Sequence, residues 1–157
     1  AEAFEQKIKA AVDARRDGDF VIIARTDAIA VEGFEKAIER ANLYAEAGAD
    51  VVFVEAPESE EQAAAVPGAV ARPALYNWCY GGKSPLLPAE RVSEMGYKFI
   101  LFTDALYAVS KTLIELYGEI KRSGTYLGYA DRMLPFDEFN DLMDLKKIAA
   151  LDEKYGA

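Results

Sequence analysis

Apolar residues follow two different spacings over the first 125 positions of the chain. Short apolar runs occupy residues 20–25, 51–55, 73–77 and 97–103, and they have the length of buried strands. Before and between them, apolar residues recur three and four positions apart, and helix-capping residues appear. The helices expected on these grounds cover residues 1–16, 31–48, 59–65, 88–96 and 104–122. A helix followed by four strand–helix units predicts an α/β fold with a parallel sheet and right-handed crossovers.

Two architectures fit four such units: a doubly wound open sheet, or about half of a (β/α)8 TIM barrel. The Gly-x-Gly-x-x-Gly turn of dinucleotide-binding open sheets follows none of the predicted strands. The strands end instead on the polar side chains of Arg25, Glu55, Asn77 and Thr103. Barrel enzymes build their sites from such strand ends, so the barrel is favoured. The wholly apolar first strand is expected where helices cover both faces of a parallel sheet.

The pattern changes after about residue 125. An apolar stripe at helical spacing continues there, through Phe136, Phe139 and Leu142, but no strand precedes it. We therefore expect residues 1–125 to form half of a barrel and residues 126–157 to form a helical extension. A whole barrel takes about 200 to 400 residues, so this chain of 157 residues is expected to be a fragment. The open edges of a half-barrel predict self-association.

Composition narrows the range of functions. The net charge of −9 argues against nucleic acid or an anionic membrane surface as a partner. No apolar run approaches the roughly 18 residues of a membrane span, and no secretory signal is visible. Cys79 is the only cysteine, which indicates a reducing compartment, and we expect a cytoplasmic location. The sequence has no histidine, which excludes Ser-His and Cys-His pairs and His-rich zinc sites built from this chain alone.

Residues 22–57 carry a more specific signal: IIARTDAIAVEGFEKAIERANLYAEAGADVVFVEAP. This segment resembles the central signature of the isocitrate lyase and phosphoenolpyruvate mutase superfamily. The likeness is closest to its branch of methylisocitrate lyase, dimethylmalate lyase and carboxyphosphonoenolpyruvate mutase-like proteins, and it continues through Asn77 and the GGKSP loop. The resemblance implies the C-terminal half of a (β/α)8 barrel. It also implies a dimer or tetramer in which the last helix is exchanged between subunits.

The resemblance implies a cofactor as well. Family members bind Mg²⁺ through acidic strand ends, and they carry a catalytic cysteine in a mobile Lys-Lys-Cys-Gly-His loop. Both features are expected upstream of residue 1, so Mg²⁺ ligands are expected in an N-terminal half and none in this chain. Cys79 does not correspond to the cysteine of that loop.

Roles for individual residues follow from the same resemblance. Arg25 is expected to grip a substrate carboxylate and to stabilise negative charge as a C–C bond breaks, since a guanidinium offers paired hydrogen bonds. Asp27 is expected to orient Arg25. Glu55 is expected to line the pocket and exchange protons, and because the mutases tend to have histidine there, it favours a lyase. The alternatives are a structural Arg25–Asp27 ion pair, and a Glu55 that merely satisfies Arg25.

The third predicted strand adds further candidates. Asn77 is expected to hydrogen-bond a substrate carboxylate, although asparagine also forms turns. The backbone N–H groups of Gly81 and Gly82 are expected to face a carboxylate, although glycine pairs are mostly turns. Tyr80 stands where relatives often have glutamate, which predicts either a difference in specificity or a divergent function. Asp104 is expected to be the N-cap of the following helix.

The expected function is a Mg²⁺-dependent C–C lyase that cleaves a small 2-hydroxy di- or tricarboxylate to a 2-oxo acid and a second acid. Fold alone does not separate this activity from phosphonomutase, C–P hydrolase or oxaloacetate decarboxylase chemistry on the same scaffold. An inactive fragment is the remaining alternative. The small carboxylic acid and further copies of the protein are the expected partners, with neither nucleic acid nor membrane.

Overall fold

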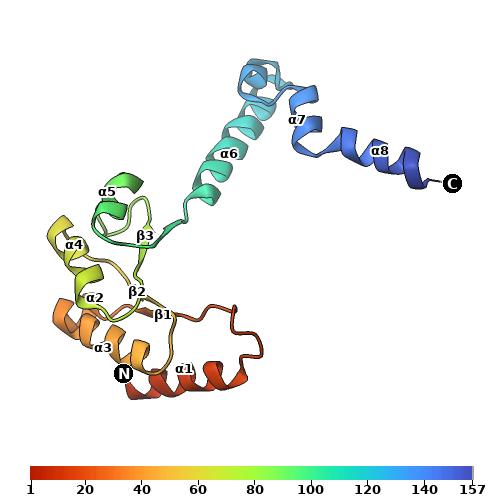
Figure 1. Ribbon diagram of the computed structural model, residues 1–157. Coiled ribbons are helices and arrows are strands. Elements are labelled where there is room, and N and C mark those ends of the chain that lie inside the picture. Colours follow the sequence, from red (N-terminus) through yellow and green to blue (C-terminus); the bar gives the residue numbers. More distant parts are fainter. Residues whose placement is uncertain (157) are drawn as a thin grey trace. The chain divides into compact units, whose positions relative to one another are not determined.

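The computed structural model describes residues 1–156, and it divides the chain into two compact units (Figure 1). The first unit comprises Ala1–Ala105 and the second begins at Leu106. All of the strands and all of the predicted strand-end residues lie in the first unit.

Helices and strands alternate through the first unit. Their order is α1 (Glu2–Ala14), β1 (Ile23–Thr26), α2 (Ile29–Glu32), α3 (Phe34–Glu46), β2 (Val51–Val54), α4 (Glu60–Ala69), β3 (Leu75–Trp78), α5 (Ala89–Glu94) and β4 (Phe99–Phe102). Strand β1 pairs with β2, and β3 with β4, both in parallel. A parallel bridge between Val52 and Ala74 joins the two pairs. The spatial order of the strands therefore follows the chain, and no strand crosses over another.

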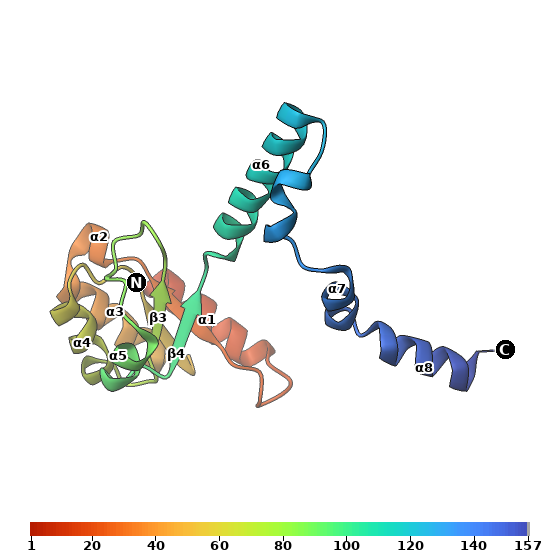
Figure 2. The ribbon, with the colours of Figure 1, turned by 90° about the horizontal axis from the view of Figure 1, so that it is seen from above.

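The helices cover one face of this sheet. Even-numbered strand residues such as Val52, Ala74 and Tyr76 form a buried core with side chains of α3, α4 and α5, and Figure 2 shows these helices beside the strands. Helix α1 joins the same face, because Ile8 and Ala24 share a second buried cluster. Alternate residues of a strand point to opposite faces, so the odd-numbered residues face away from the helices.

The opposite face is apolar and partly uncovered. Val51, Phe53 and Leu75 form a small buried cluster on it. Ile23, Phe99 and Leu101 are 49%, 45% and 43% exposed. Sequential strands with helices on one side only are the arrangement of a barrel wall, whereas a doubly wound sheet has helices on both faces. The expectation that helices cover both faces of the first strand is therefore wrong for the described residues.

Local sequence explains where elements begin and end. Gly48, at φ +107°, ends the α3 segment as predicted, and a Cβ there would come within 2.9 Å of a Val12 methyl group. Ser59 caps α4 by accepting a hydrogen bond from the Gln62 N–H at 3.2 Å, also as predicted. The Gln62 side chain accepts from the N–H of Glu58 rather than of Ser59, so the capping box is only half formed.

All regular elements in the described residues of the second unit are helices. It contains the rest of α6 (Ala105–Ser123), the 3-10 helix η1 (Leu127–Arg132), α7 (Phe136–Leu142) and α8 (Leu145–Tyr155). Tyr129 is buried, and Arg132 forms an ion pair with Glu115 at 2.5 Å. Within residues 1–156, no helix combines the length and the apolar character that crossing a membrane requires.

Candidate active site

Arg25 lies at the C-terminal end of β1 and pairs with the nearby Asp27. Its Nε and Nη2 donate to the two carboxylate oxygens of Asp27 at 2.8 to 3.3 Å. This hydrogen bonding raises the pKa of Arg25, so the guanidinium stays charged. The guanidinium carbon also lies 4.8 Å from the centre of the Phe53 ring, its partner in the β1–β2 register. Asp27 is thus placed to orient Arg25, and the ring of Phe53 packs against the guanidinium.

Glu55 links the tips of three adjacent strands. Its carboxylate lies 3.3 Å from Nη2 of Arg25 and accepts from Nδ2 of Asn77 at 3.3 and 3.4 Å. The Glu55 side chain is only 19% exposed, whereas that of Arg25 is 46% exposed. All three residues have odd numbers and occupy the face opposite the helices. The predicted meeting of guanidinium, carboxylate and amide at one edge of the sheet is therefore observed.

Asn77 has an unused acceptor. Its amide nitrogen faces Glu55, while its Oδ1 is buried and has no hydrogen-bond partner among the described residues. A buried carbonyl oxygen without a partner costs about 1–3 kcal/mol, so it marks a place where a ligand donor would bind favourably. The orientation of the amide follows from its bond to Glu55.

The backbone is strained directly after Glu55. Ala56 has φ +59°, a left-handed conformation that costs a residue other than glycine about 1–2 kcal/mol. Strain of this kind gathers at functional sites, where the surrounding structure maintains it. Here the N–H of Glu55 donates to the Thr26 carbonyl at 2.9 Å, which fixes the chain on the β1 side. No sequence signal pointed to Ala56.

The loop after β3 carries the remaining candidates. The N–H of Gly82 donates to the Cys79 carbonyl at 3.0 Å and closes a tight turn, with Gly81 at φ +78°. The N–H of Gly82 is therefore occupied within the turn, and Gly81 is the better candidate for facing a carboxylate. Asp104 directly precedes α6, the position at which a helix cap was expected, and it accepts hydrogen bonds from the N–H of Tyr80 and the hydroxyl of Thr103.

Two surface hollows lie near opposite ends of the strands. One is lined by Arg25 and Asp27 together with Phe4, Val31 and Tyr44, but Glu55 and Asn77 do not line it. Of Arg25, Glu55 and Asn77, which are linked by contacts at the strand tips, only Arg25 lines this hollow. This hollow is therefore not one that the three strand-end groups share.

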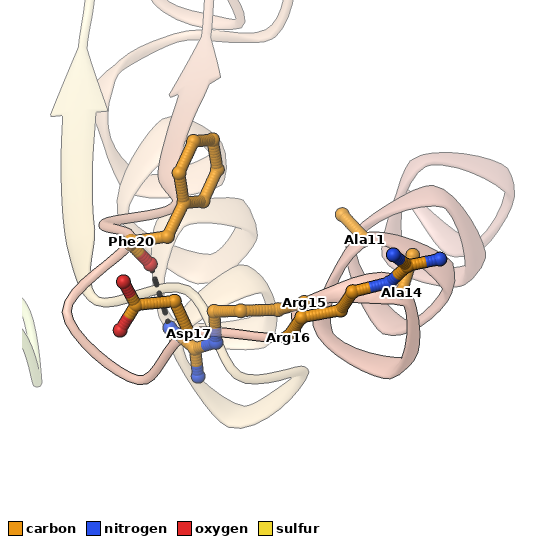
Figure 3. A pocket seen from close by; sticks show the side chains of 6 residues that line it. All are labelled: Ala11, Ala14, Arg15, Arg16, Asp17 and Phe20. Carbon is orange, nitrogen blue, oxygen red and sulfur yellow. Dashed lines mark hydrogen bonds between the residues drawn. The ribbon is translucent and has the colours of Figure 1, made fainter.

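The other hollow lies at the end of α1 and is lined by Ala11, Ala14, Arg15, Arg16, Asp17 and Phe20 (Figure 3). Arg15 there donates to the Phe20 carbonyl at 3.1 Å and to the Asp50 carboxylate at 2.7 Å. Phe20 and Asp50 precede β1 and β2, so this hollow is at the N-terminal edge of the sheet. That edge of a barrel serves stability, and active sites are at the opposite edge.

The described residues do not fit a magnesium site. Within residues 1–156, no group of three or more His, Cys, Asp or Glu side chains is close enough to hold a metal ion. The carboxylates of Asp27 and Glu55 both contact the positively charged Arg25, which disfavours a second cation there. Mg²⁺ prefers six oxygen ligands in near-octahedral geometry. Asp27 and Glu55 do not provide this coordination by themselves.

Comparison with known proteins identifies the family. The profile described as phosphoenolpyruvate phosphomutase matches residues 1–118. The chain is 41% identical to 2,3-dimethylmalate lyase of Eubacterium barkeri, over 95% of the chain and 52% of that protein. It is 43% identical to 2-methylisocitrate lyase of Aeropyrum pernix, over 90% of the chain and 46% of that protein. The chain thus spans about half the length of these relatives.

Solved structures agree with the sequence comparison. A crystal structure of 2,3-dimethylmalate lyase superposes with a TM-score of 0.88 at 31% identity, covering 99% of this chain and 55% of that one. A phosphonopyruvate hydrolase structure, in complex with oxalate and Mg²⁺, superposes with a TM-score of 0.83 at 26% identity, covering 98% and 56%. These matches confirm the expected TIM-barrel type, of which the chain covers about half. The chain belongs to the phosphoenolpyruvate phosphomutase family, within the phosphoenolpyruvate mutase and isocitrate lyase superfamily.

Proposed function

We propose that the protein is a C–C lyase for a small 2-hydroxy di- or tricarboxylate of the dimethylmalate or methylisocitrate kind. The observation that carries this proposal is the line of contacts from Arg25 through Glu55 to Asn77, across the tips of three adjacent strands. It places a cation, a carboxylate and an amide within reach of one small acid. The names of the relatives support the substrate class.

Each group has a distinct role in the proposed cleavage. The substrate hydroxyl loses its proton, the C–C bond breaks, and the departing acid gains a proton at carbon, so neither water nor an oxidant is consumed. Arg25 binds a carboxylate of the departing acid and stabilises the negative charge that builds on its oxygens. Glu55, held between Arg25 and Asn77, takes part in the proton transfer to that carbon.

Asn77 would recognise the hydroxyl group. Its unused Oδ1 accepts a hydrogen bond, and a 2-hydroxy acid offers an O–H donor, whereas a carboxylate does not. A 2-hydroxy acid therefore suits this amide better than a 2-oxo acid does.

The metal and the oligomer are part of the same proposal. A structure of a relative, phosphonopyruvate hydrolase, contains Mg²⁺, and we expect the ligands for a comparable ion to come from residues outside this chain. We expect the protein to assemble as a homo-oligomer and to work in the cytoplasm.

The test is product release from defined acids. The intact protein is incubated with Mg²⁺ and 2,3-dimethylmalate, methylisocitrate, phosphonopyruvate or oxaloacetate in turn, and 2-oxo acids and phosphate are measured. Release of a 2-oxo acid from either 2-hydroxy acid, abolished by EDTA, is the expected result. Phosphate release from phosphonopyruvate alone would favour the hydrolase alternative. We expect the 157-residue chain by itself to show no turnover and to self-associate.

A further inference from the structure

The turn after β3 presents one backbone donor away from itself. Gly82 closes the turn onto Cys79, and the positive φ of Gly81 is the geometry of a type II turn with Tyr80 at its second position. The N–H of the second residue takes no part in the hydrogen bond that closes such a turn. In this structure that N–H donates to Asp104 Oδ2 at 2.9 Å.

Other contacts hold the loop elsewhere. The hydroxyl of Tyr76 and the indole of Trp78 donate to the carbonyls of Pro85 and Leu87, which fixes the part of the loop that leads into α5. Lys83 reaches Glu58 at 3.2 Å, but both side chains are more than half exposed, and pairs of this kind contribute little. The tip of the turn therefore depends on Asp104 for its firm attachment to the sheet.

Asp104 is well placed for this purpose. It follows β4, which pairs directly with β3, and its carboxylate is also held by the Thr103 hydroxyl at 3.4 Å. A bond from a backbone N–H to a carboxylate is about twice as strong as one between neutral groups. Tyr80 is three residues beyond Asn77 and two beyond the end of β3, so this bond fixes the loop that begins directly after the β3 tip.

We propose that Asp104 is a positioning residue that fixes the Cys79–Gly82 turn at the rim of the strand-tip site and thereby sets the affinity for substrate. The proposal rests on the proposed function only in that the bound molecule is the 2-hydroxy acid. Asp104 acts through the main chain of Tyr80 and touches no reacting atom.

Two substitutions of Asp104 separate hydrogen bonding from charge. In the intact protein, Asp104→Ala should raise KM for 2,3-dimethylmalate about five- to tenfold, with kcat changed by less than about twofold. Asp104→Asn should raise KM only about two- to threefold, because its amide oxygen still accepts the N–H but carries no charge. Asp17→Ala is the matched control, since Asp17 also accepts a backbone N–H at 2.9 Å, from Asp19, far from the site. An equal increase in KM in Asp104→Asn and Asp104→Ala would overturn the proposal.

A second pair of variants tests the donor side. Proline suits the second position of a type II turn but has no N–H, so Tyr80→Pro removes the donor and Tyr80→Ala keeps it. Tyr80→Pro should show the higher KM, by about the same factor as Asp104→Ala. Equal KM values for the two variants would also overturn the proposal. This pair decides the question even if Asp104→Ala fails to fold.

Tryptophan fluorescence tests the attachment of the loop without a measurement of turnover. Trp78 is the only tryptophan of the chain and lies at the base of the loop. Acrylamide quenching of its fluorescence should increase in Asp104→Ala and Tyr80→Pro but not in Asp104→Asn, with Trp78→Phe supplying the background. Increased quenching in a protein that cleaves none of the acids would retain the anchoring role and reject the proposed function. If the variants cleave the acids with unchanged KM and show unchanged quenching, the proposed function is retained and the anchoring role of Asp104 is rejected.

Discussion

Replacing Arg25 by methionine separates a functional arginine from a structural one. Methionine keeps an unbranched apolar side chain at this position but removes the guanidinium that lies over Phe53 and contacts Asp27 and Glu55. The side chains of Arg25 and Asp27 are 46% and 64% exposed, so their ion pair contributes only a little to folding. We expect the free energy of unfolding to fall by about 1 kcal/mol, mainly because Glu55 loses one partner.

The effect on catalysis should be much larger. Hydrogen bonds to a charged group contribute about 1.5–3 kcal/mol, which corresponds to a decrease of roughly 10- to 150-fold in kcat/KM. This decrease in kcat/KM is a lower limit, because any stabilisation of charge in the transition state by Arg25 would add to it. The assay is 2-oxo acid release from 2,3-dimethylmalate, followed as a hydrazone, with urea unfolding of the same samples.

Arg91→Met is the control for this experiment. Arg91 is also an arginine of the first unit, its side chain is 49% exposed, and it pairs with two carboxylates, those of Glu60 and Glu94. It lies on α5, away from the strand tips. If both arginine variants lower kcat/KM equally, or if the loss in Arg25→Met follows its loss of stability, Arg25 is structural and the assignment is wrong.

Three further predictions concern the site and the fold. Asn77→Asp places a carboxylate against Glu55 in place of the amide donor, so kcat/KM should fall by more than about tenfold, whereas unchanged kinetics would remove Asn77 from the site. Gly48→Ala puts a Cβ within 2.9 Å of Val12 at positive φ, and urea unfolding should show a loss of about 1–3 kcal/mol; a loss below experimental error would contradict the packing described. The backbone hydrogen bond from Ile22 lowers the pKa of Asp50, so this carboxylate stabilises the fold above its unfolded pKa, and the stabilisation is lost as pH falls through the lower folded value. Asp50→Asn should therefore cost about 1 kcal/mol or less near neutral pH, since the side chain is 36% exposed, and the difference from wild type should shrink below about pH 4; a difference that grows in acid would refute this account.

Periodicity was sufficient to predict the order of the elements. The four strands and most helices lie close to the ranges that apolar spacing predicted. The helix expected over residues 31–48 is divided at Gly33 into α2 and α3, and the helix expected over residues 59–65 continues as α4 to Ala69.

The first strand begins at Ile23 rather than at residue 20. The N–H of Ile22 bonds to the side chain of Asp50, not to a neighbouring strand, and this contact joins residues 28 positions apart. Propensity cannot predict such a contact.

The site was predictable in part for a related reason. Polar residues at the ends of parallel strands must meet at one edge, so Arg25, Glu55 and Asn77 could be grouped from the sequence. The details depended on register and on tertiary contacts. The commitment of the Asn77 amide to Glu55, the strain at Ala56 and the contact of Asp104 with Tyr80 appear only in the folded chain.

The strict alternation of faces along β2 limits how this protein can vary in length. Val54 points into the helix layer and Glu55 to the opposite face. Deleting one residue within the strand would exchange these two environments, burying a carboxylate among alanines and presenting valine to the ligand. Natural insertions and deletions should therefore fall in the connections between strands and helices, and engineered grafts should be joined there as well.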